Sequence, residues 1–197
     1  MEKEIAIAIL AAGASTRMGQ PKQLLDFRGE SLIRKVIKVA LSSDSHPVLV
    51  VLGAHAAAIK PEIEDQDVVI VENSAWQQGL STSIRTAVAA LHSNFPQCSA
   101  VLFLLADQPF VSPVHLSAIK AAYFQTGLPI VASYYGEKSG VPALFDQSLF
   151  AALLSLQGDQ GAGTLIKTFQ EKVFSIKFPE GIWDIDTPED YDVIVRK

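Results

Sequence analysis

The sequence has a single cysteine, Cys98, among 197 residues, and its four histidines stand at no zinc-ligand spacing. These shortages exclude an internal disulfide and argue against a zinc site. No apolar run reaches the roughly 20 residues that cross a bilayer, and no charged segment with an apolar leader behind it opens the chain. We therefore expect a cytoplasmic protein that makes no contact with a membrane.

Basic residues are also fewer than acidic residues. The chain has 16 Lys and Arg against 21 Asp and Glu, a formal net charge of −5. It therefore has no broad attraction for nucleic acid, and any contact with a nucleotide must come from a local group of residues. Apolar side chains are plentiful, since 49% of the residues are hydrophobic. That content can form one sizeable core, and we expect a single domain over residues 1–197.

Apolar runs of strand length alternate with helix-spaced apolar positions along most of the chain. Strands are predicted at 5–10, 47–52, 68–71, 100–106, 130–134, 143–145 and 173–178, and helices at 32–40, 81–91, 113–125 and 148–156. This order predicts an α/β fold with a mostly parallel sheet, helices on both faces and right-handed crossovers. Gly136, Gly140 and Pro142 interrupt regular structure, so a local excursion is expected at 134–145.

A loop of small residues with two cations follows the first apolar run. Residues 11–14 are Ala-Ala-Gly-Ala, and Arg17 and Lys22 come soon after. Ligands of open α/β sheets collect at the carboxyl ends of strands, and small residues let backbone N–H groups approach an anion. The loop matches neither a Walker motif, because Met18 stands where glycine is needed, nor the dinucleotide fingerprint, because Ala11 replaces its first glycine. The pattern indicates a polyphosphate site of another kind.

Three carboxylates are candidates for a site at the same edge. Asp107 directly follows the buried run 101–106, although an aspartate before a proline is also common in turns. Asp184 and Asp186 alternate with Ile185 and share one face of an extended segment. Asp186 is the stronger candidate of the two. The residues after it, 187–190, read as a helix start with Thr187 as N-cap, and they need no catalytic explanation.

A polar loop leads into the predicted helix 81–91. It carries Asn73, Gly79, Ser81 and Ser83, and capping is the ordinary role of such hydroxyls. Residues 79–83 approach a serine nucleophile motif but lack its closing glycine, so a serine hydrolase is not indicated.

Residues 10–22, Leu-Ala-Ala-Gly-Ala-Ser-Thr-Arg-Met-Gly-Gln-Pro-Lys, resemble the signature of the molybdenum cofactor nucleotidyltransferase (MobA/MocA-like) family. The resemblance continues through blocks at 73–83, 105–109, 158–162 and 184–190, in the same order. It implies a Rossmann-like three-layer α/β/α nucleotidyltransferase fold. It also implies nucleotide binding by Leu10, Ala11, Ala12, Gly13, Ser15, Arg17, Lys22, Asn73, Gly79 and Ser83, catalysis by Arg17 and Lys22, Mg²⁺ at Asp107 and Asp186, and acceptor binding by Gly158, Asp159 and Gly161.

The activity implied is transfer of a nucleoside monophosphate from an NTP to a phosphate acceptor. Within the family, members with alanine at the position of Ala12 resemble the cytidylyltransferases. The resemblance therefore predicts that the substrates are CTP and molybdopterin and that the product is molybdopterin cytosine dinucleotide. Two departures fall in the acceptor region, because Val141 precedes Pro142 where a polar residue is common, and Gly163 stands where a basic residue is common.

Three alternatives therefore stay open: a transferase for a sugar or polyol phosphate, a guanylyltransferase that uses GTP, and a non-catalytic accessory module that carries cofactor to a client molybdoenzyme.

Overall fold

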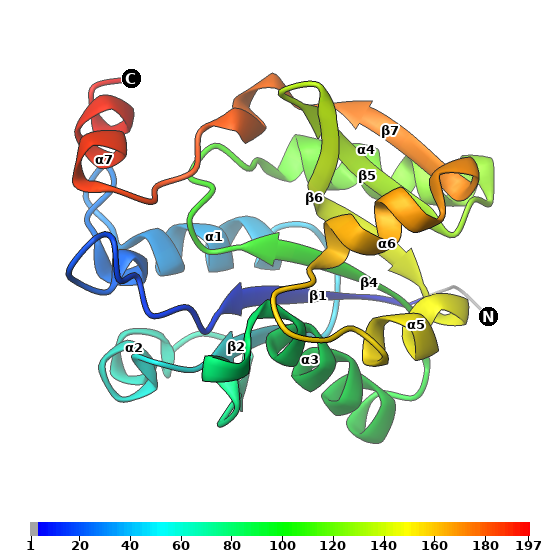
Figure 1. The fold of residues 1–197 in the computed structure, drawn as a ribbon, viewed down its shortest axis with the longest axis horizontal. Helices are drawn as coiled ribbons and strands as arrows, with labels where there is room; N and C mark the ends of the chain where they lie inside the picture. Colours follow the sequence, from blue (N-terminus) through cyan, green and yellow to red (C-terminus); the bar gives the residue numbers. More distant parts are fainter. Residues whose placement is uncertain (1–3) are drawn as a thin grey trace.

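A computed structural model describes residues 4–197 and shows a seven-stranded sheet flanked by helices (Figure 1). The strand order is β3-β2-β1-β4-β6-β5-β7. The strands are β1 Glu4–Ala11, β2 Val48–Leu52, β3 Val69–Glu72, β4 Cys98–Leu105, β5 Ile130–Tyr135, β6 Lys138–Asp146 and β7 Val173–Lys177. Only β6 runs antiparallel to its neighbours among these strands, so the expected mostly parallel sheet is confirmed.

Seven α-helices accompany the sheet in the described residues. They are α1 Leu32–Leu41, α2 Ala56–Ile63, α3 Leu80–Asn94, α4 Pro113–Thr126, α5 Phe150–Leu154, α6 Ala162–Thr168 and α7 Pro188–Val195. Helices α1, α2 and α4 pack on one face, and α3, α5 and α6 pack on the other. This is the three-layer arrangement that the resemblance implies. No helix within residues 4–197 is long and apolar enough to span a bilayer.

The sequence of strand β1 is continuously apolar because both faces of the strand are buried. Ile5, Ile7 and Ile9 join the cluster beneath α1, α2 and α4, whereas Ala6 and Ala8 join the cluster beneath α3, α5 and α6. Since both faces of the strand are covered, no position on it is left for a polar side chain. The small alanines also let the long helix α3 approach the sheet closely.

Three features differ from the sequence prediction. Helix α2 was not predicted, and Pro61 lies inside it. Helix α6 was not predicted either, because its glycine and threonine residues give no apolar periodicity. Strand β6 extends well beyond the predicted 143–145 and forms a hairpin with β5 across the expected excursion. Its antiparallel direction depends on pairing with β4 and β5, which local sequence does not encode.

Segments far apart in the chain meet at the carboxyl ends of β1 and β4. The two strands are parallel, with Leu10 opposite Leu105, so the loop after β1 and the segment 106–108 leave the sheet together. The Ile185 amide donates to the Asp107 carbonyl oxygen at 3.1 Å. A third apolar cluster then fastens the C-terminal segment to the loop, with Met18, Leu25, Phe27, Leu32, Ile185 and Ile194 as its members. Figure 1 shows α7 standing beside this loop, away from the other helices.

Candidate active site

The loop after β1 is held from below by a buried glutamine. Gln23 is 2% exposed, and its amide donates to the carbonyl oxygens of Ala11 (2.9 Å) and Gly13 (3.2 Å). The Ser15 hydroxyl accepts from the backbone amide of Lys22 and donates to Gln23. Ser15, predicted to bind nucleotide, thus also ties the loop together. Gln23 was not predicted, because its partners are backbone carbonyls that sequence spacing does not reveal.

These contacts leave the backbone amides of the loop unused. Within the described part of the chain, no backbone N–H group of residues 13–17 donates a hydrogen bond to another protein atom. Successive N–H groups of this kind form a concavity that binds anions. The small side chains predicted to favour anion binding therefore do expose the backbone.

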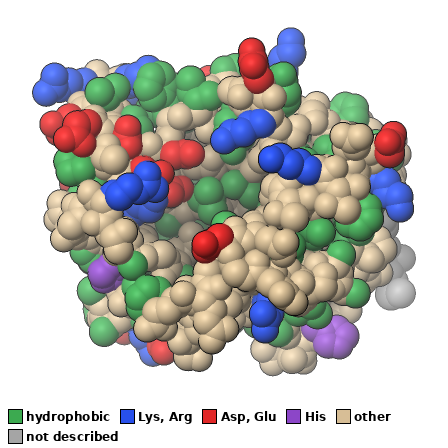
Figure 2. Space-filling view, in the orientation of Figure 1, with side chains coloured by type: hydrophobic (Ala, Val, Ile, Leu, Met, Phe, Trp, Pro, Cys, Tyr) green, Lys and Arg blue, Asp and Glu red, His purple; other side chains and the backbone are tan. Residues whose placement is uncertain are grey.

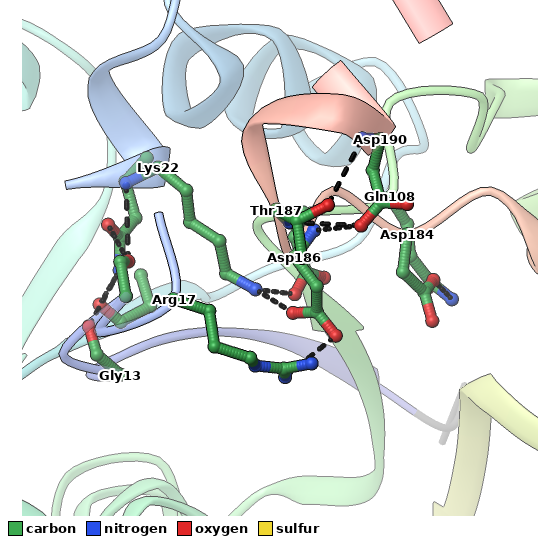
Figure 3. Close-up of polar contacts among 12 residues, drawn as sticks. Gly13, Arg17, Lys22, Gln108, Asp184, Asp186, Thr187 and Asp190 are labelled. Carbon is green, nitrogen blue, oxygen red and sulfur yellow. Dashed lines mark hydrogen bonds and ion pairs between the residues drawn. The ribbon is translucent and has the colours of Figure 1, made fainter. Parts of the chain in front are cut away.

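Four charged side chains meet in front of the loop (Figure 3). Lys22 Nζ lies 2.5 Å from Asp107 Oδ2 and 2.8 Å from Asp186 Oδ1. Arg17 Nη2 lies 3.0 Å from Asp186 Oδ2. The Lys22 and Asp107 side chains are each 15% exposed, whereas Arg17 is 69% exposed. The structure thus brings together the two cations and two carboxylates that the sequence singled out, from three distant segments.

The ion pairs keep Lys22 and Asp186 charged. Burial alone would lower the pKa of Lys22, but Asp107 and Asp186 outweigh it and raise the pKa above its ordinary value. Burial would raise the pKa of Asp186, yet Lys22 and Arg17 hold it below its ordinary value. Of the three N–H donors on Lys22, two serve carboxylates and one remains for another acceptor.

The start of α7 fixes the position of Asp186. Thr187 is the N-cap, its hydroxyl accepts from the Asp190 amide, and the Asp190 carboxylate accepts from the Thr187 amide at 2.9 Å. The same carboxylate accepts from the Asp186 amide at 3.3 Å. The predicted helix start at 187–190 is confirmed as a capping box. It explains why Asp186 faces the loop while Ile185 enters the core.

Asp107 has an oxygen that the protein leaves unsatisfied. Its Oδ1 is buried and accepts no hydrogen bond from any group among residues 4–197. An unsatisfied buried carboxylate oxygen is costly unless a ligand completes it. Among the described residues, no group of three or more His, Cys, Asp or Glu is arranged so that it could hold a metal ion by itself. Mg²⁺ suits such a site, because it commonly binds one or two carboxylates together with substrate phosphates and water. Asp107 and Asp186 therefore fit the predicted divalent ion.

A second polar group behind Asp107 was not predicted. The Gln108 amide donates to Asp184 Oδ1 at 3.1 Å, and Gln108 is 2% exposed. Tyr135 donates from its hydroxyl to the Val141 carbonyl at 2.9 Å beside them. Asp184 is thus engaged with Gln108 and takes no part in the pairs with Lys22 and Arg17. Gln108 links the end of β4 to the segment that carries Asp186.

Replacing Asp184 by asparagine is expected to stabilise the fold at neutral pH. Burial raises the pKa of Asp184, and the charge of Asp107 raises it further, so its ionised form weakens the folded state. A carboxyl with a raised pKa costs stability above that pKa, and the cost vanishes below the unfolded value of about 3.9. Thermal unfolding between pH 4 and 8 should show a higher Tm for Asp184→Asn at pH 8 and a gap that closes in acid. A gap independent of pH would contradict this assignment.

Three pockets follow one another along this edge. The central pocket, about 210 Å³, is lined by Gly13, Lys22 and Asp107. The loop pocket, about 520 Å³, is lined by Trp76, Gly79 and Asp159 and shares Ala12, Gly13, Leu80 and Ser83 with the central pocket. The hairpin pocket, about 350 Å³, lies between the β5–β6 hairpin and α6. Figure 2 shows this face hollowed over an apolar floor, with acidic and basic side chains together on one rim.

Asn73 supports the loop pocket from beneath. It is 3% exposed, and its amide nitrogen donates to Thr82 Oγ1 (2.8 Å) and Ser83 Oγ (3.1 Å), while its oxygen accepts from the Ala75 amide. The side chain predicted to touch nucleotide is therefore fully used inside the protein. Ser83 lines both pockets and is the member of this group that faces them.

The predicted acceptor block 158–161 lies against Gly79. The Gly158 carbonyl accepts from the Ser81 amide at 3.1 Å, so it caps the start of α3. Asp159 lines the loop pocket, and Gly161 lines the hairpin pocket. The structure thus splits the block, with Asp159 on the side of Gly79 and Gly161 on the side of the β5–β6 hairpin.

Adding a side chain at Gly79 is expected to disturb the loop pocket. Gly79 has φ +102°, and a Cβ there would collide with the Gly158 carbonyl and lie 2.7 Å from Asp159 Oδ1. Gly79→Ala should therefore raise the KM for nucleotide by about tenfold with a smaller change in kcat. The matched control is Gly127→Ala, which carries a similar backbone strain at φ +65° without a collision. Equal effects of both variants on KM would contradict the prediction.

Comparison with known proteins agrees with this geometry. The family model described as a MobA-like NTP transferase domain matches residues 7–173. The chain belongs to this family. Among relatives of this MobA-like protein, purine catabolism protein PucB of Bacillus subtilis (strain 168) is 33% identical over 198 residues, covering 95% of this chain and 94% of PucB. Nicotine blue oxidoreductase of Paenarthrobacter nicotinovorans is 31% identical, covering 81% of this chain and 79% of that protein.

Solved structures show the same fold over the whole MobA-like chain. Rv0371c of Mycobacterium tuberculosis H37Rv superposes with a TM-score of 0.82 at 27% identity, covering 100% of both chains. A complex of Rv0371C with manganese matches with a TM-score of 0.80. Family and fold together support a nucleotidyltransferase with a nucleotide substrate, in agreement with the sequence prediction.

Proposed function

We propose that this protein transfers CMP from CTP to the phosphate of molybdopterin and releases pyrophosphate. The observation that carries the proposal is the row of unused amides at 13–17, which lies beside Lys22 and Asp107 of the central pocket, with Arg17 joined to the same group through Asp186. This arrangement suits a triphosphate, whose charge needs both N–H donors and cations. The product would be molybdopterin cytosine dinucleotide.

The reaction is a direct displacement. An oxygen of the acceptor phosphate attacks the α-phosphorus of CTP, the bond to the α,β-bridging oxygen breaks, and pyrophosphate leaves. The acceptor phosphate is already anionic, so no general base is needed. Lys22 and Arg17 orient the triphosphate and stabilise the charge that develops on the leaving pyrophosphate. Asp107 and Asp186 would hold Mg²⁺, which when bound neutralises phosphate oxygens.

Ala12 supports the choice of CTP. It is 4% exposed and lies in the wall shared by the central and loop pockets, where a nucleoside would join its phosphates. The resemblance associates alanine at this position with cytidylyl transfer and glycine with guanylyl transfer. Asp159 and Trp76 line the remaining space for the base. The proposal also includes a cytoplasmic location and a brief contact with a client molybdoenzyme, which must receive the product.

The test is pyrophosphate release. The protein is mixed with Mg²⁺ or Mn²⁺ and with CTP, GTP or ATP, in the presence of molybdopterin, a sugar phosphate or a polyol phosphate. We expect release with CTP and molybdopterin above all other pairs. A preference for GTP would overturn the base assignment, and faster release with a sugar or polyol phosphate would overturn the acceptor. A thermal shift with CTP but no release with any acceptor would indicate an accessory carrier.

A further inference from the structure

The Lys22 ammonium group contacts both candidate metal ligands at once (Figure 3). Its Nζ lies 2.5 Å from Asp107 Oδ2 and 2.8 Å from Asp186 Oδ1. Among residues 4–197, no other cation forms ion pairs with both of these carboxylates. A divalent ion that two carboxylates share also lies between them and contacts an oxygen of each. The ammonium group therefore stands where such an ion would bind.

Three of the four carboxylate oxygens of Asp107 and Asp186 are already paired with cations. Lys22 takes one oxygen of each acid, and Arg17 Nη2 lies 3.0 Å from the second oxygen of Asp186. The fourth oxygen, Asp107 Oδ1, accepts no hydrogen bond from any group in the described residues. An ion bound at that oxygen alone would have a single protein ligand. An ion bound by both acids must displace Lys22 or Arg17.

The charges of this group already balance, because two cations face two carboxylates. An added divalent ion would leave positive charge in excess at a place where the Lys22 and Asp107 side chains are each 15% exposed, and such an excess is costly. A triphosphate removes this cost, because it brings several negative charges to the unused amides of residues 13–17. Lys22 therefore opposes binding of the ion before the nucleotide arrives and not afterwards.

Lys22 can change partners without a movement of its backbone. Its amide donates to Ser15 Oγ at 3.2 Å, and it begins a short 3₁₀ helix, Lys22–Leu24. The charge is carried at the end of a flexible aliphatic stem with rotatable N–H donors. Lys22 and Asp107 line the central pocket together with Gly13, which belongs to the row of unused amides. The ammonium group can therefore turn from the carboxylates to a phosphate oxygen within one pocket.

We infer that Lys22 is a resident cation of the metal site, which keeps a divalent ion from the place between Asp107 and Asp186 until a triphosphate draws the ammonium group away. The inference rests on the proposed function for the identity of the metal ligands, and it adds the order of binding. A divalent ion binds poorly to the nucleotide-free protein, and it binds well together with the triphosphate or after it. Arg17 contributes less to this exclusion, because it contacts one carboxylate and is 69% exposed.

The first test is calorimetric titration of the nucleotide-free protein with Mn²⁺. Lys22→Met should lower the Kd of Mn²⁺ by about tenfold, because the place between the carboxylates is then open. Lys22→Gln should show the same gain, and Arg17→Met a gain of about twofold. Lys38→Met is the matched control, because Lys38 pairs with Glu30 and is 60% exposed, and the Kd should not change. Adding Asp107→Asn to Lys22→Met should abolish the gain.

The second test is a crystal structure of the unmodified protein with Mn²⁺ and α,β-methylene CTP, an analogue whose bridging carbon replaces the oxygen of the bond that breaks. Lys22 Nζ should contact a phosphate oxygen and lie beyond ion-pair distance, about 4 Å, of Asp107 and Asp186. If Lys22 still lay between the two acids, with Mn²⁺ bound elsewhere, the inference would be wrong.

Three calorimetric results would also overturn the inference. They are an unchanged or higher Kd of Mn²⁺ in both Lys22 variants, an equal gain in Lys38→Met, and a gain that survives the addition of Asp107→Asn. Failure of the proposed function looks different. Tighter Mn²⁺ binding by Lys22→Met, without pyrophosphate release from any pair of nucleotide and acceptor, would remove the transferase and keep the exchange of cations. Pyrophosphate release by the unmodified protein, with no gain in the Lys22 variants, would do the reverse.

Discussion

Replacing Lys22 by methionine is expected to lower kcat/KM for nucleotidyl transfer by about 10³-fold, or about 4 kcal/mol of transition-state stabilisation. Lys22 Nζ is the cation held between Asp107 and Asp186, and it has one donor left for a phosphate oxygen. The fold should lose less, about 1–2 kcal/mol, because the methionine retains the aliphatic stem while two carboxylates lose a partner. Steady-state kinetics and denaturant unfolding of the same preparations separate the two quantities.

The control for charge and length is Lys38→Met. Lys38 pairs with Glu30 at 2.5 Å on the surface and is 60% exposed, so its loss should leave turnover unchanged. A loss of activity in Lys22→Met that merely tracked its loss of stability, or that Lys38→Met reproduced, would show that Lys22 has no role in turnover.

Replacing Asp107 by asparagine is expected to lower kcat by about 10²- to 10³-fold and to raise the divalent ion concentration needed for half-maximal rate. Asparagine has nearly the same shape, so packing at the end of β4 is kept. The substitution removes the charge of the buried carboxylate whose Oδ1 accepts no hydrogen bond within the described residues. Rates measured over a Mg²⁺ titration, and again with Mn²⁺, give both quantities.

Asp65→Asn provides the comparison for Asp107→Asn. Asp65 pairs with Arg34 at 2.7 Å on the surface and is 58% exposed. Its loss should change neither the rate nor the metal requirement. If Asp107→Asn retained a normal rate with an unchanged metal requirement, Asp107 would have no part in metal binding, and the proposed mechanism would lose one of its two ligands.

Sequence patterns predicted most of the elements because the sheet is buried on both faces. The continuous apolar runs at 5–10 and 100–106 are typical of central strands, and the ends of β1 and β4 lie within two residues of those limits. Thr187 and Pro188 predicted the start of α7 because capping depends on residues adjacent in the chain. Features of this kind depend on residues that are close in the chain, so they can be predicted from the sequence alone.

Other features depend on partners that are distant in the chain. Gln23 and Gln108 are polar residues that look exposed in sequence, yet each is 2% exposed, with partners in other segments. Asn73 was expected to contact the nucleotide, but its side-chain amide donates hydrogen bonds to Thr82 and Ser83. The positions of buried amide side chains depend on hydrogen-bond partners in the folded chain, and the hydrophobic pattern of the sequence does not reveal those partners.

The residues alone were enough to predict a mostly parallel α/β sheet and a cationic loop of small residues after its first strand, because both depend on local composition and spacing. The nucleotidyltransferase family came from the resemblance carried by residues 10–22 and the later blocks. Which charged side chains contact one another is decided by the tertiary structure. Asp107 and Asp186 are 79 positions apart in the numbering. Asp107 meets Lys22 because β4 pairs with β1, and Asp186 meets it because the apolar cluster that includes Ile185 and Ile194 packs α7 beside the loop. Such a contact is a property of packing between distant segments, and it therefore became visible only in three dimensions.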